Sequence, residues 1–192
     1  MRPPVRARLQ QPTAFRASDQ PPIPGPRPPG TRAYLDSETS FEGGITIIGI
    51  YGADRGIIQL VGGEVTDVGL VRALEGVETL CTYNGDRFDL PVIRQRLGVD
   101  LWQVCRPHDL MRDCWRVGLK GGLKRVEAQI GIVRQTQGVD GRAAMRLWAS
   151  YWNDGDVDAL QTLLLYNRED VVNLALLDAY LEPYRNADAR RL

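Results

Sequence analysis

Residues 32–61 read RAYLDSETSFEGGITIIGIYGADRGIIQLV, and this stretch decides the fold. It holds three apolar segments, at 32–36, 44–51 and 56–61, and the second is a β-branched run typical of a buried strand. A turn at 53–56 separates the last two segments. Three strands joined by such short connections predict an antiparallel meander.

Beyond the meander, helical and extended patterns alternate. We expect a short helix at 67–75, a strand at 77–83 ending at Asn84-Gly85, a helix at 90–97 stopped by Gly98, a weaker strand at 103–110, and helices at 122–130, 141–152 and 156–181. A meander followed by β/α units predicts an α/β fold. Its sheet is mixed, with the three-strand antiparallel meander plus parallel strands, and helices pack on it.

Composition narrows the function classes. The chain has 192 residues, and 24 Lys+Arg balance 24 Asp+Glu, which argues against a basic nucleic-acid coat protein or a polybasic membrane binder. No apolar run approaches the roughly 20 residues of a membrane helix, and no signal peptide is evident. Three cysteines without CxxC spacing argue against a disulfide framework and against a zinc site. We therefore expect a cytoplasmic protein with no membrane partner.

Residues 1–30 differ from the remainder, since they hold nine of the 12 prolines. We expect a disordered, extended leader there, although a Pro-rich ligand for a protein partner is the alternative. The leader carries five arginines and one acid, a charge of +4, so the remainder carries −4. The expected organisation is a leader at 1–30, a domain at 31–185 and a short tail at 186–192.

Three groups of acids stand at informative places. Asp36 and Glu38 lie two apart on an extended segment, so their side chains share one face of the sheet. Asp89 opens a helix after a strand, and strand ends are where α/β sheets bind ligands. Tyr166 and Asp170 share one helix face with apolar neighbours, which directs Asp170 inward and Asn167 away or toward the rim. Taken singly, each group also reads as a polar strand end, an acidic helix start or a helix-surface acid.

Taken together, these groups offer four carboxylates and a tyrosine. Carboxylate oxygens suit hard cations such as Mg²⁺ or Mn²⁺. Two such ions about 4 Å apart can clamp a phosphodiester and activate water, and the Tyr166 hydroxyl could orient that water. The combination predicts phosphodiester hydrolysis.

The same motifs resemble a known family. Leu35-Asp36-Ser37-Glu38-Thr39, Tyr83-Asn84-Gly85 with Phe88-Asp89-Leu90-Pro91, and Tyr166-Asn167-Arg168-Glu169-Asp170 are similar to the motifs of DEDD-type 3′–5′ exonucleases of the ribonuclease H-like superfamily, and most of all to the YprB-type domain. The similarity covers about 31–182 and implies a five-stranded mixed sheet.

The resemblance also implies residue roles. It makes Asp36, Glu38, Asp89 and Asp170 the ligands of two Mg²⁺ or Mn²⁺ ions, and Tyr166 the residue that positions water. Thr39 and Asn84 match positions that touch the terminal nucleotide, and we add Phe88 to this substrate-binding set. The expected enzyme is a two-metal-ion 3′–5′ exonuclease acting on RNA or single-stranded DNA.

Two other functions stay open: a non-catalytic nucleic-acid-binding module of the same fold, and a phosphatase for small phosphoesters. We interpret several further residues as structural rather than catalytic. We expect His108 in a structural or rim position, and Trp148 and Trp152 in core packing rather than base stacking. Basic residues beside Gly121-Gly122 at a helix start form either a phosphate site or a solvated basic face: Lys120, Lys124 and Arg125. Three further arginines, with the same two interpretations, are assigned only to a strand-tracking surface: Arg134, Arg142 and Arg146.

Overall fold

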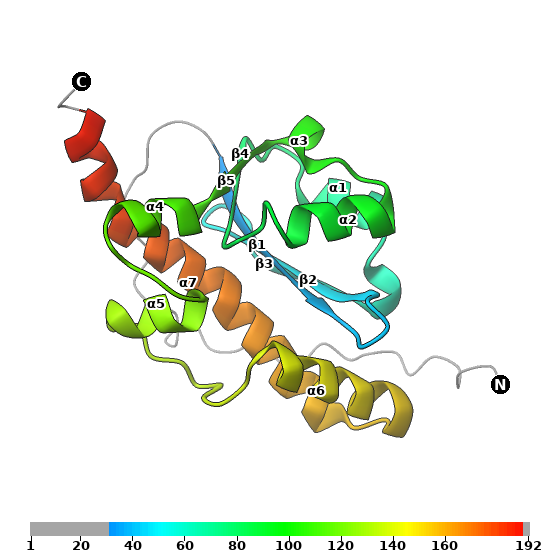
Figure 1. The fold of residues 1–192 in the computed structure, drawn as a ribbon. Helices are drawn as coiled ribbons and strands as arrows, with labels where there is room; N and C mark the ends of the chain where they lie inside the picture. Colours follow the sequence, from blue (N-terminus) through cyan, green and yellow to red (C-terminus); the bar gives the residue numbers. More distant parts are fainter. Residues whose placement is uncertain (1–30, 190–192) are drawn as a thin grey trace.

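A computed structural model describes residues 31–189 (Figure 1). Its centre is a five-stranded sheet in the order β3-β2-β1-β4-β5. The strands are β1 (Arg32–Thr39), β2 (Ile45–Gly52), β3 (Gly56–Val61), β4 (Thr79–Thr82) and β5 (Arg106–Asp109). The predicted leader lies outside the described residues.

The pairing of the strands confirms the predicted meander. β1 pairs antiparallel with β2, and β2 pairs antiparallel with β3. β4 adds parallel to the other edge of β1, and β5 adds parallel to β4. The predicted α/β fold with a mixed sheet is therefore confirmed.

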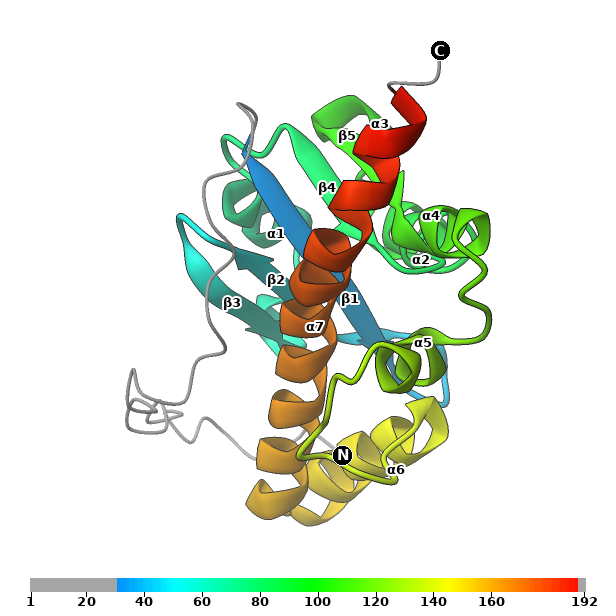
Figure 2. The ribbon, with the colours of Figure 1, turned by 90° about the vertical axis from the view of Figure 1, so that its left-hand side faces the viewer.

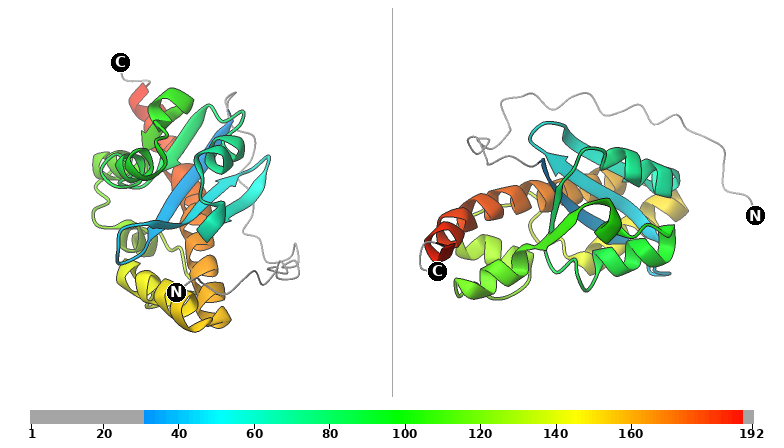
Figure 3. Two further views of the ribbon diagram at one scale, coloured as in Figure 1. Left: turned by 90° about the vertical axis from the view of Figure 1, so that its right-hand side faces the viewer. Right: turned by 90° about the horizontal axis from the view of Figure 1, so that it is seen from above.

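Helices cover both faces of the sheet. The helical elements are η2 (Gly62–Glu64), α1 (Asp67–Ala73), α2 (Asp89–Leu97), α3 (Leu101–Val104), α4 (Leu110–Arg116), α5 (Leu123–Gln129), α6 (Gly141–Asp154) and α7 (Val157–Ala189). The long α7 lies across one face, over β1 and β2 (Figure 2). α1 and α2 lie on the other face, so the sheet is sandwiched between two helical layers (Figure 3).

Alternation along β1 divides its side chains between these layers. Ala33 and Leu35 are buried in the core beneath α1 and α2, whereas Tyr34 is buried in the core beneath α7. Continuing this period of two, Asp36 and Glu38 face α7 and Ser37 faces α2. The strand thus sends two acids and the residue between them to opposite layers.

Several predicted boundaries were wrong. β1 continues to Thr39 rather than ending at Asp36, because its antiparallel pairing with β2 extends to the Thr39–Ile45 pair. The predicted strand at 103–110 is shorter, because only 106–109 pair with β4. Its predicted start belongs instead to the short helix α3, which Asp100 caps by accepting a hydrogen bond from the Trp102 backbone amide. Helix α4 was not predicted, and α7 runs to residue 189. No helix within 31–189 has the length and apolar character needed to cross a membrane.

Candidate metal centre

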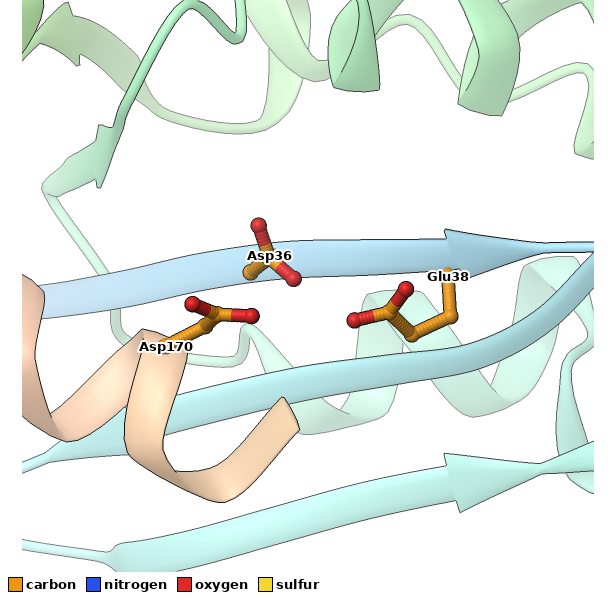
Figure 4. Close-up of side chains that lie close together, drawn as sticks. All are labelled: Asp36, Glu38 and Asp170. Carbon is orange, nitrogen blue, oxygen red and sulfur yellow. The ribbon is translucent and has the colours of Figure 1, made fainter. Parts of the chain in front are cut away.

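Three carboxylates meet between β1 and α7. Asp36 and Glu38 extend from the strand and Asp170 from the helix, and each offers an oxygen within 4.8 Å of the others. Figure 4 shows the three carboxylate groups pointing toward one another across the interface of strand and helix. Glu38 and Asp170 are buried, and Asp36 is partly buried.

The sequence of α7 places Asp170 there. The helix buries one continuous stripe with spacings of three and four, which is the pattern of a helix face packed on a core. That stripe contains Leu163, Tyr166, Asn167, Asp170, Val171 and Leu174. Because apolar residues anchor both ends of the stripe against the sheet, the polar residues in its middle are carried inward with them.

Asn167 corrects one prediction, since it is not turned toward the rim. Its side chain has no exposed surface and donates to the backbone carbonyl of Asp36 at 3.3 Å. It also accepts from Gln59 of β3 at 3.0 Å. Gly49, the partner of Asp36 on β2, makes room, because a Cβ there would overlap the Asn167 amide. The signal in the sequence was its place in the stripe, one residue after Tyr166.

Asp89 approaches the strand from its edge. The pairing of β4 with β1 ends at Tyr34. Farther along β1, the backbone amide of Ser37 donates to the Asp89 carboxylate at 3.0 Å. The Ser37 hydroxyl donates to the same carboxylate oxygen at 2.6 Å. Asp89 is buried and is not one of the three carboxylates within 4.8 Å, but its charge raises the pKa of Asp36 and Glu38. It therefore lies beside the cluster as a fourth acid.

The cluster carries a large electrostatic cost. Burial, and then the neighbouring carboxylates, raise the pKa of Asp36 well above its usual range. Burial and the charge of Asp170 raise the pKa of Glu38 to about 8, and burial raises that of Asp89 to about 6. Burial also raises the pKa of Asp170, although Arg134 and Lys124 oppose it. Such a group of acids favours either protons or a cation.

Arg134 supplies one internal cation and corrects another prediction. It was grouped with exposed basic residues, but its side chain is only 8% exposed. The guanidinium donates to both carboxylate oxygens of the buried Glu127, at 2.5 and 2.6 Å, and to Asp170 at 2.5 Å. Beside these bonds, the Glu169 carboxylate accepts hydrogen bonds from the backbone amides of Gln135 and Thr136. These bonds attach the loop before α6 to α7.

Lys124 supplies the second cation. Its ammonium group donates to the Tyr166 hydroxyl at 2.5 Å and lies 4.0 Å from Asp170. It also lies 4.3 Å from the centre of the Tyr166 ring. Burial, followed by the charges of Asp170, Glu38 and Asp36, raises the pKa of Tyr166, so the phenol stays protonated. With Lys124 donating to its oxygen, the Tyr166 hydroxyl keeps its own proton to donate.

The predicted substrate-binding residues lie at the ends of the elements that carry the acids or beside them in the sequence. Thr39 closes β1 at a register irregularity directly after Glu38. Asn84 follows β4 in the left-handed conformation, with φ of 61°, and its backbone N–H donates to the Asp109 carboxylate at the end of β5. Phe88 precedes α2 and is 43% exposed. Their predicted contacts with a nucleotide stay predictions.

Other predicted residues have structural surroundings. His108 pairs with Asp113 at 2.8 Å, and Arg185 of α7 pairs with the same carboxylate, as expected of a structural position. Trp148 is buried, as expected for core packing. Trp152 is 60% exposed, so that prediction was wrong for Trp152, which stacks on the outer side of Trp148.

The donor set fits a hard divalent cation. Asp36, Glu38 and Asp170 offer only oxygen atoms, within one small volume. These three acids and the adjacent Asp89 have two cations near them: Lys124, which lies 4.0 Å from Asp170, and Arg134, which pairs with Asp170 and also with Glu127. Carboxylates in excess of local positive charge are the usual setting for Mg²⁺ or Mn²⁺.

Comparisons with known proteins agree with this fold. A family model described as the RNase H superfamily matches residues 33–182. A family B DNA polymerase from the hyperthermophilic archaeon Pyrobaculum calidifontis has a similar structure, with a TM-score of 0.62 at 20% identity. The match covers 82% of this chain and only 25% of the polymerase chain, so the likeness concerns the fold of a part of that enzyme. No curated protein sequence matches significantly.

Proposed function

The chain belongs to the RNase H superfamily, and from that premise we propose that it is a metal-dependent nuclease that removes nucleotides from the 3′ end of a nucleic-acid strand. The DEDD-type resemblance of its motifs supports the exonuclease class and the 3′–5′ polarity.

One observation carries the proposal. Asp36 and Glu38 from the central strand and Asp170 from the long helix place carboxylate oxygens within 4.8 Å of one another. A protein that only held nucleic acid would gain nothing from this arrangement, because buried anions repel phosphate. The same anions become useful when a divalent cation lies between them and the phosphate.

We assign metal binding to Asp36, Glu38, Asp170 and the adjacent Asp89. Bound Mg²⁺ or Mn²⁺ would supply Lewis-acid stabilisation of the charge that develops on a phosphodiester. Ser37 orients Asp89, and Asn167 holds the β1 backbone at Asp36 against α7. Ser37 and Asn167 thus fix the positions of the proposed metal ligands Asp89, at the start of α2, and Asp36, on β1.

The remaining residues act on water and charge. The neutral Tyr166 hydroxyl, which accepts from Lys124, can donate its proton to a water molecule and fix its orientation. Lys124 keeps a positive charge beside the site and is only partly buried, at 38% exposure, so it can also reach a substrate phosphate. Arg134 fixes the position of Asp170 through their ion pair.

A direct experiment measures release of nucleotides from an end-labelled oligonucleotide. We expect hydrolysis in Mg²⁺ or Mn²⁺, none in EDTA, and recovery when the metal is returned. Asp36→Ala should abolish it, whereas Asp158→Ala, which changes an exposed acid of α7, should not. Equal hydrolysis by the parent and Asp36→Ala would refute the proposal.

A non-catalytic binding module is the second candidate, and one observation favours it. Arg134 and Lys124 already place positive charge on Asp170, which lowers the need for a metal there. Tight oligonucleotide binding without hydrolysis in any divalent cation would support this function. Hydrolysis of nucleoside monophosphates, but not of oligonucleotides, would instead indicate a phosphatase.

A further inference from the structure

An apolar groove, which we call the α1 groove, lies between α1 and the segment that joins α2 to β5. Its volume is about 660 Å³, comparable with that of a small-ligand site. Val68 is 69% exposed and Val71 is 46% exposed, and burying such side chains under an apolar segment is favourable. Most of the lining side chains are aliphatic: Val68, Val71, Leu74, Val77, Leu97 and Val104 are among them.

The α1 groove and the acidic cluster lie on opposite faces of the sheet. Leu74 and Val77 of the groove belong to the core beneath α1 and α2. Asp170 of the cluster lies on α7, which packs on the other face. A segment bound in the α1 groove therefore leaves the acidic cluster accessible.

The chain enters the sheet next to this groove. The Thr31 carbonyl accepts hydrogen bonds from the backbone amides of Glu78, at 2.9 Å, and Thr79, at 3.2 Å. Val77, which directly precedes Glu78, lines the groove. Residues 1–30, the Pro-rich leader, are thus tethered beside the groove wall. Tethering by a short linker raises the local concentration of a segment to about the mM range, so weak contacts suffice for binding.

The leader offers apolar surface that suits the groove. Residues 21–30 read PPIPGPRPPG, so Ile23 lies among prolines. Because each proline has φ fixed near −65°, such a segment loses less backbone entropy on binding than an ordinary segment does. Proline also lacks a backbone N–H, so fewer donors lose their water partners in an aliphatic groove.

Charge at the groove complements charge in the leader. The leader carries +4 and the remainder of the chain −4. Arg27 is four residues before Thr31, so the two Cα atoms are at most about 14 Å apart and the arginine side chain can reach the groove. The groove and the residue that follows it carry three acids and one arginine: Asp67, Glu75, Glu78 and Arg72.

We propose that the Pro-rich leader binds in the α1 groove of its own chain, with Ile23 and the neighbouring prolines on Val68 and Val71 and with Arg27 paired to Glu75. The bound leader removes exposed aliphatic surface from water. This assignment is independent of the proposed nuclease function, because it involves the opposite face of the sheet.

Nuclear Overhauser contacts measured by NMR on the full chain test the proposal. We expect contacts from the methyl groups of Val68 and Val71 to the side-chain protons of Ile23 and its neighbouring prolines. Val71→Asp should remove the contacts of Val68, because the groove wall then carries a charge. Val157→Asp is the matched control: it changes a valine that is 55% exposed at the start of α7, and it should leave the contacts in place.

A change in the leader tests the same contact without altering the domain. Arg27→Glu should lower the intensity of the Val68 contacts about two- to fivefold, as expected from losing one surface ion pair. Glu75→Arg in the same chain should restore them, since the pair is then reversed. Arg16→Glu makes the same charge change 11 residues earlier in the leader and should have little effect.

The absence of leader contacts to Val68 and Val71 in the parent protein would overturn the proposal. Contacts found only between isotope-labelled and unlabelled copies would also overturn it, because the groove would then bind a second copy of the chain. Equal losses for Arg27→Glu and Arg16→Glu would contradict the pairing of Arg27 with Glu75.

Discussion

Arg134 donates to Asp170 at 2.5 Å while the same guanidinium holds both oxygens of Glu127. One buried arginine therefore joins a candidate metal ligand on α7 to a carboxylate on α5. The loop that carries Arg134 contributes no strand or helix of its own, so this pairing fixes its place in the fold.

Removing Arg134 should destabilise the protein strongly. Arg134→Ala removes the guanidinium that pairs with Asp170 and with Glu127, which is 1% exposed. Because this leaves buried carboxylates without their partner, the free energy of unfolding should fall by about 3–5 kcal/mol. Arg134→Lys keeps the charge but not the two-oxygen geometry and should lose less. Urea unfolding measures both. The control Arg94→Ala removes an arginine that is 70% exposed, and it should change stability by less than about 0.5 kcal/mol. Equal effects of Arg134→Ala and Arg94→Ala would contradict the pairing.

The acidic cluster predicts an unusual pH dependence of stability in EDTA. The folded-state pKa values of Glu38, about 8, and Asp89, about 6, lie above those of exposed carboxyls. The folded state therefore binds more protons than the unfolded state, and stability should fall as pH rises from about 4 to about 8. Thermal unfolding in EDTA should show a lower Tm at pH 8 than at pH 5, and Mg²⁺ should reverse the loss at pH 8.

Glu38→Gln provides the control for this pH effect. It removes the group with the pKa of about 8, so the decline in Tm between pH 6 and pH 8 should flatten. A parent protein whose Tm rises or stays constant over this interval in EDTA would show that the carboxylates do not repel one another as described.

Gly49 should be needed for the contact between sheet and helix. A Cβ at this position would overlap the Asn167 side chain, so Gly49→Ala must displace α7 or the amide, at a cost of about 1–3 kcal/mol. The control is Gly63→Ala, where a Cβ meets no atom within 4 Å. Combining Gly49→Ala with Asn167→Ala should cost less than the sum of the two single changes, because the second removes the overlap. Strict additivity in urea unfolding would refute the close approach.

Ser37 should act through Asp89. Ser37→Ala removes the hydroxyl that donates to Asp89 at 2.6 Å but leaves the backbone amide bond in place. Loss of such a supporting bond typically weakens metal affinity about 10–100-fold, so titration with Mn²⁺ should give a correspondingly higher Kd. Ser150→Ala, which removes a hydroxyl bonded to Asp156 on the α6–α7 turn, should leave the Kd unchanged. The same Kd in the parent and Ser37→Ala would separate Asp89 from the metal centre.

The sequence was most informative where periodicity and chemistry coincide. Alternation along 32–38 correctly predicted that Asp36 and Glu38 share a face, and the apolar stripe around Tyr166 correctly predicted that Asp170 points inward. The meander followed from the β-branched run and the short turns, and the parallel strands followed from the β/α units after it. These features are local, so neighbouring residues suffice to predict them.

Long-range partners were not predictable in the same way. Arg134 resembles any surface arginine until the fold brings Glu127 and Asp170 to it, and Asn167 becomes buried only because Gly49 on a distant strand makes room. Trp152 likewise shares a helix face with Trp148, but only the β1–β2 turn opposite leaves it in a groove instead of a core. Burial of a polar or aromatic residue depends on what packs against it, which one sequence does not state.

The most direct test follows a 5′-labelled single-stranded oligonucleotide in Mn²⁺ with the parent protein and with Asp170→Asn, which keeps the shape of the side chain and removes its charge. We predict a ladder that shortens stepwise from the 3′ end with the parent, and a rate at least about 100-fold lower with Asp170→Asn, because a charged ligand of the metal centre is lost. A ladder of equal rate with Asp170→Asn, or no shortening by the parent in either Mg²⁺ or Mn²⁺, would contradict the assignment of this carboxylate cluster as a nuclease centre.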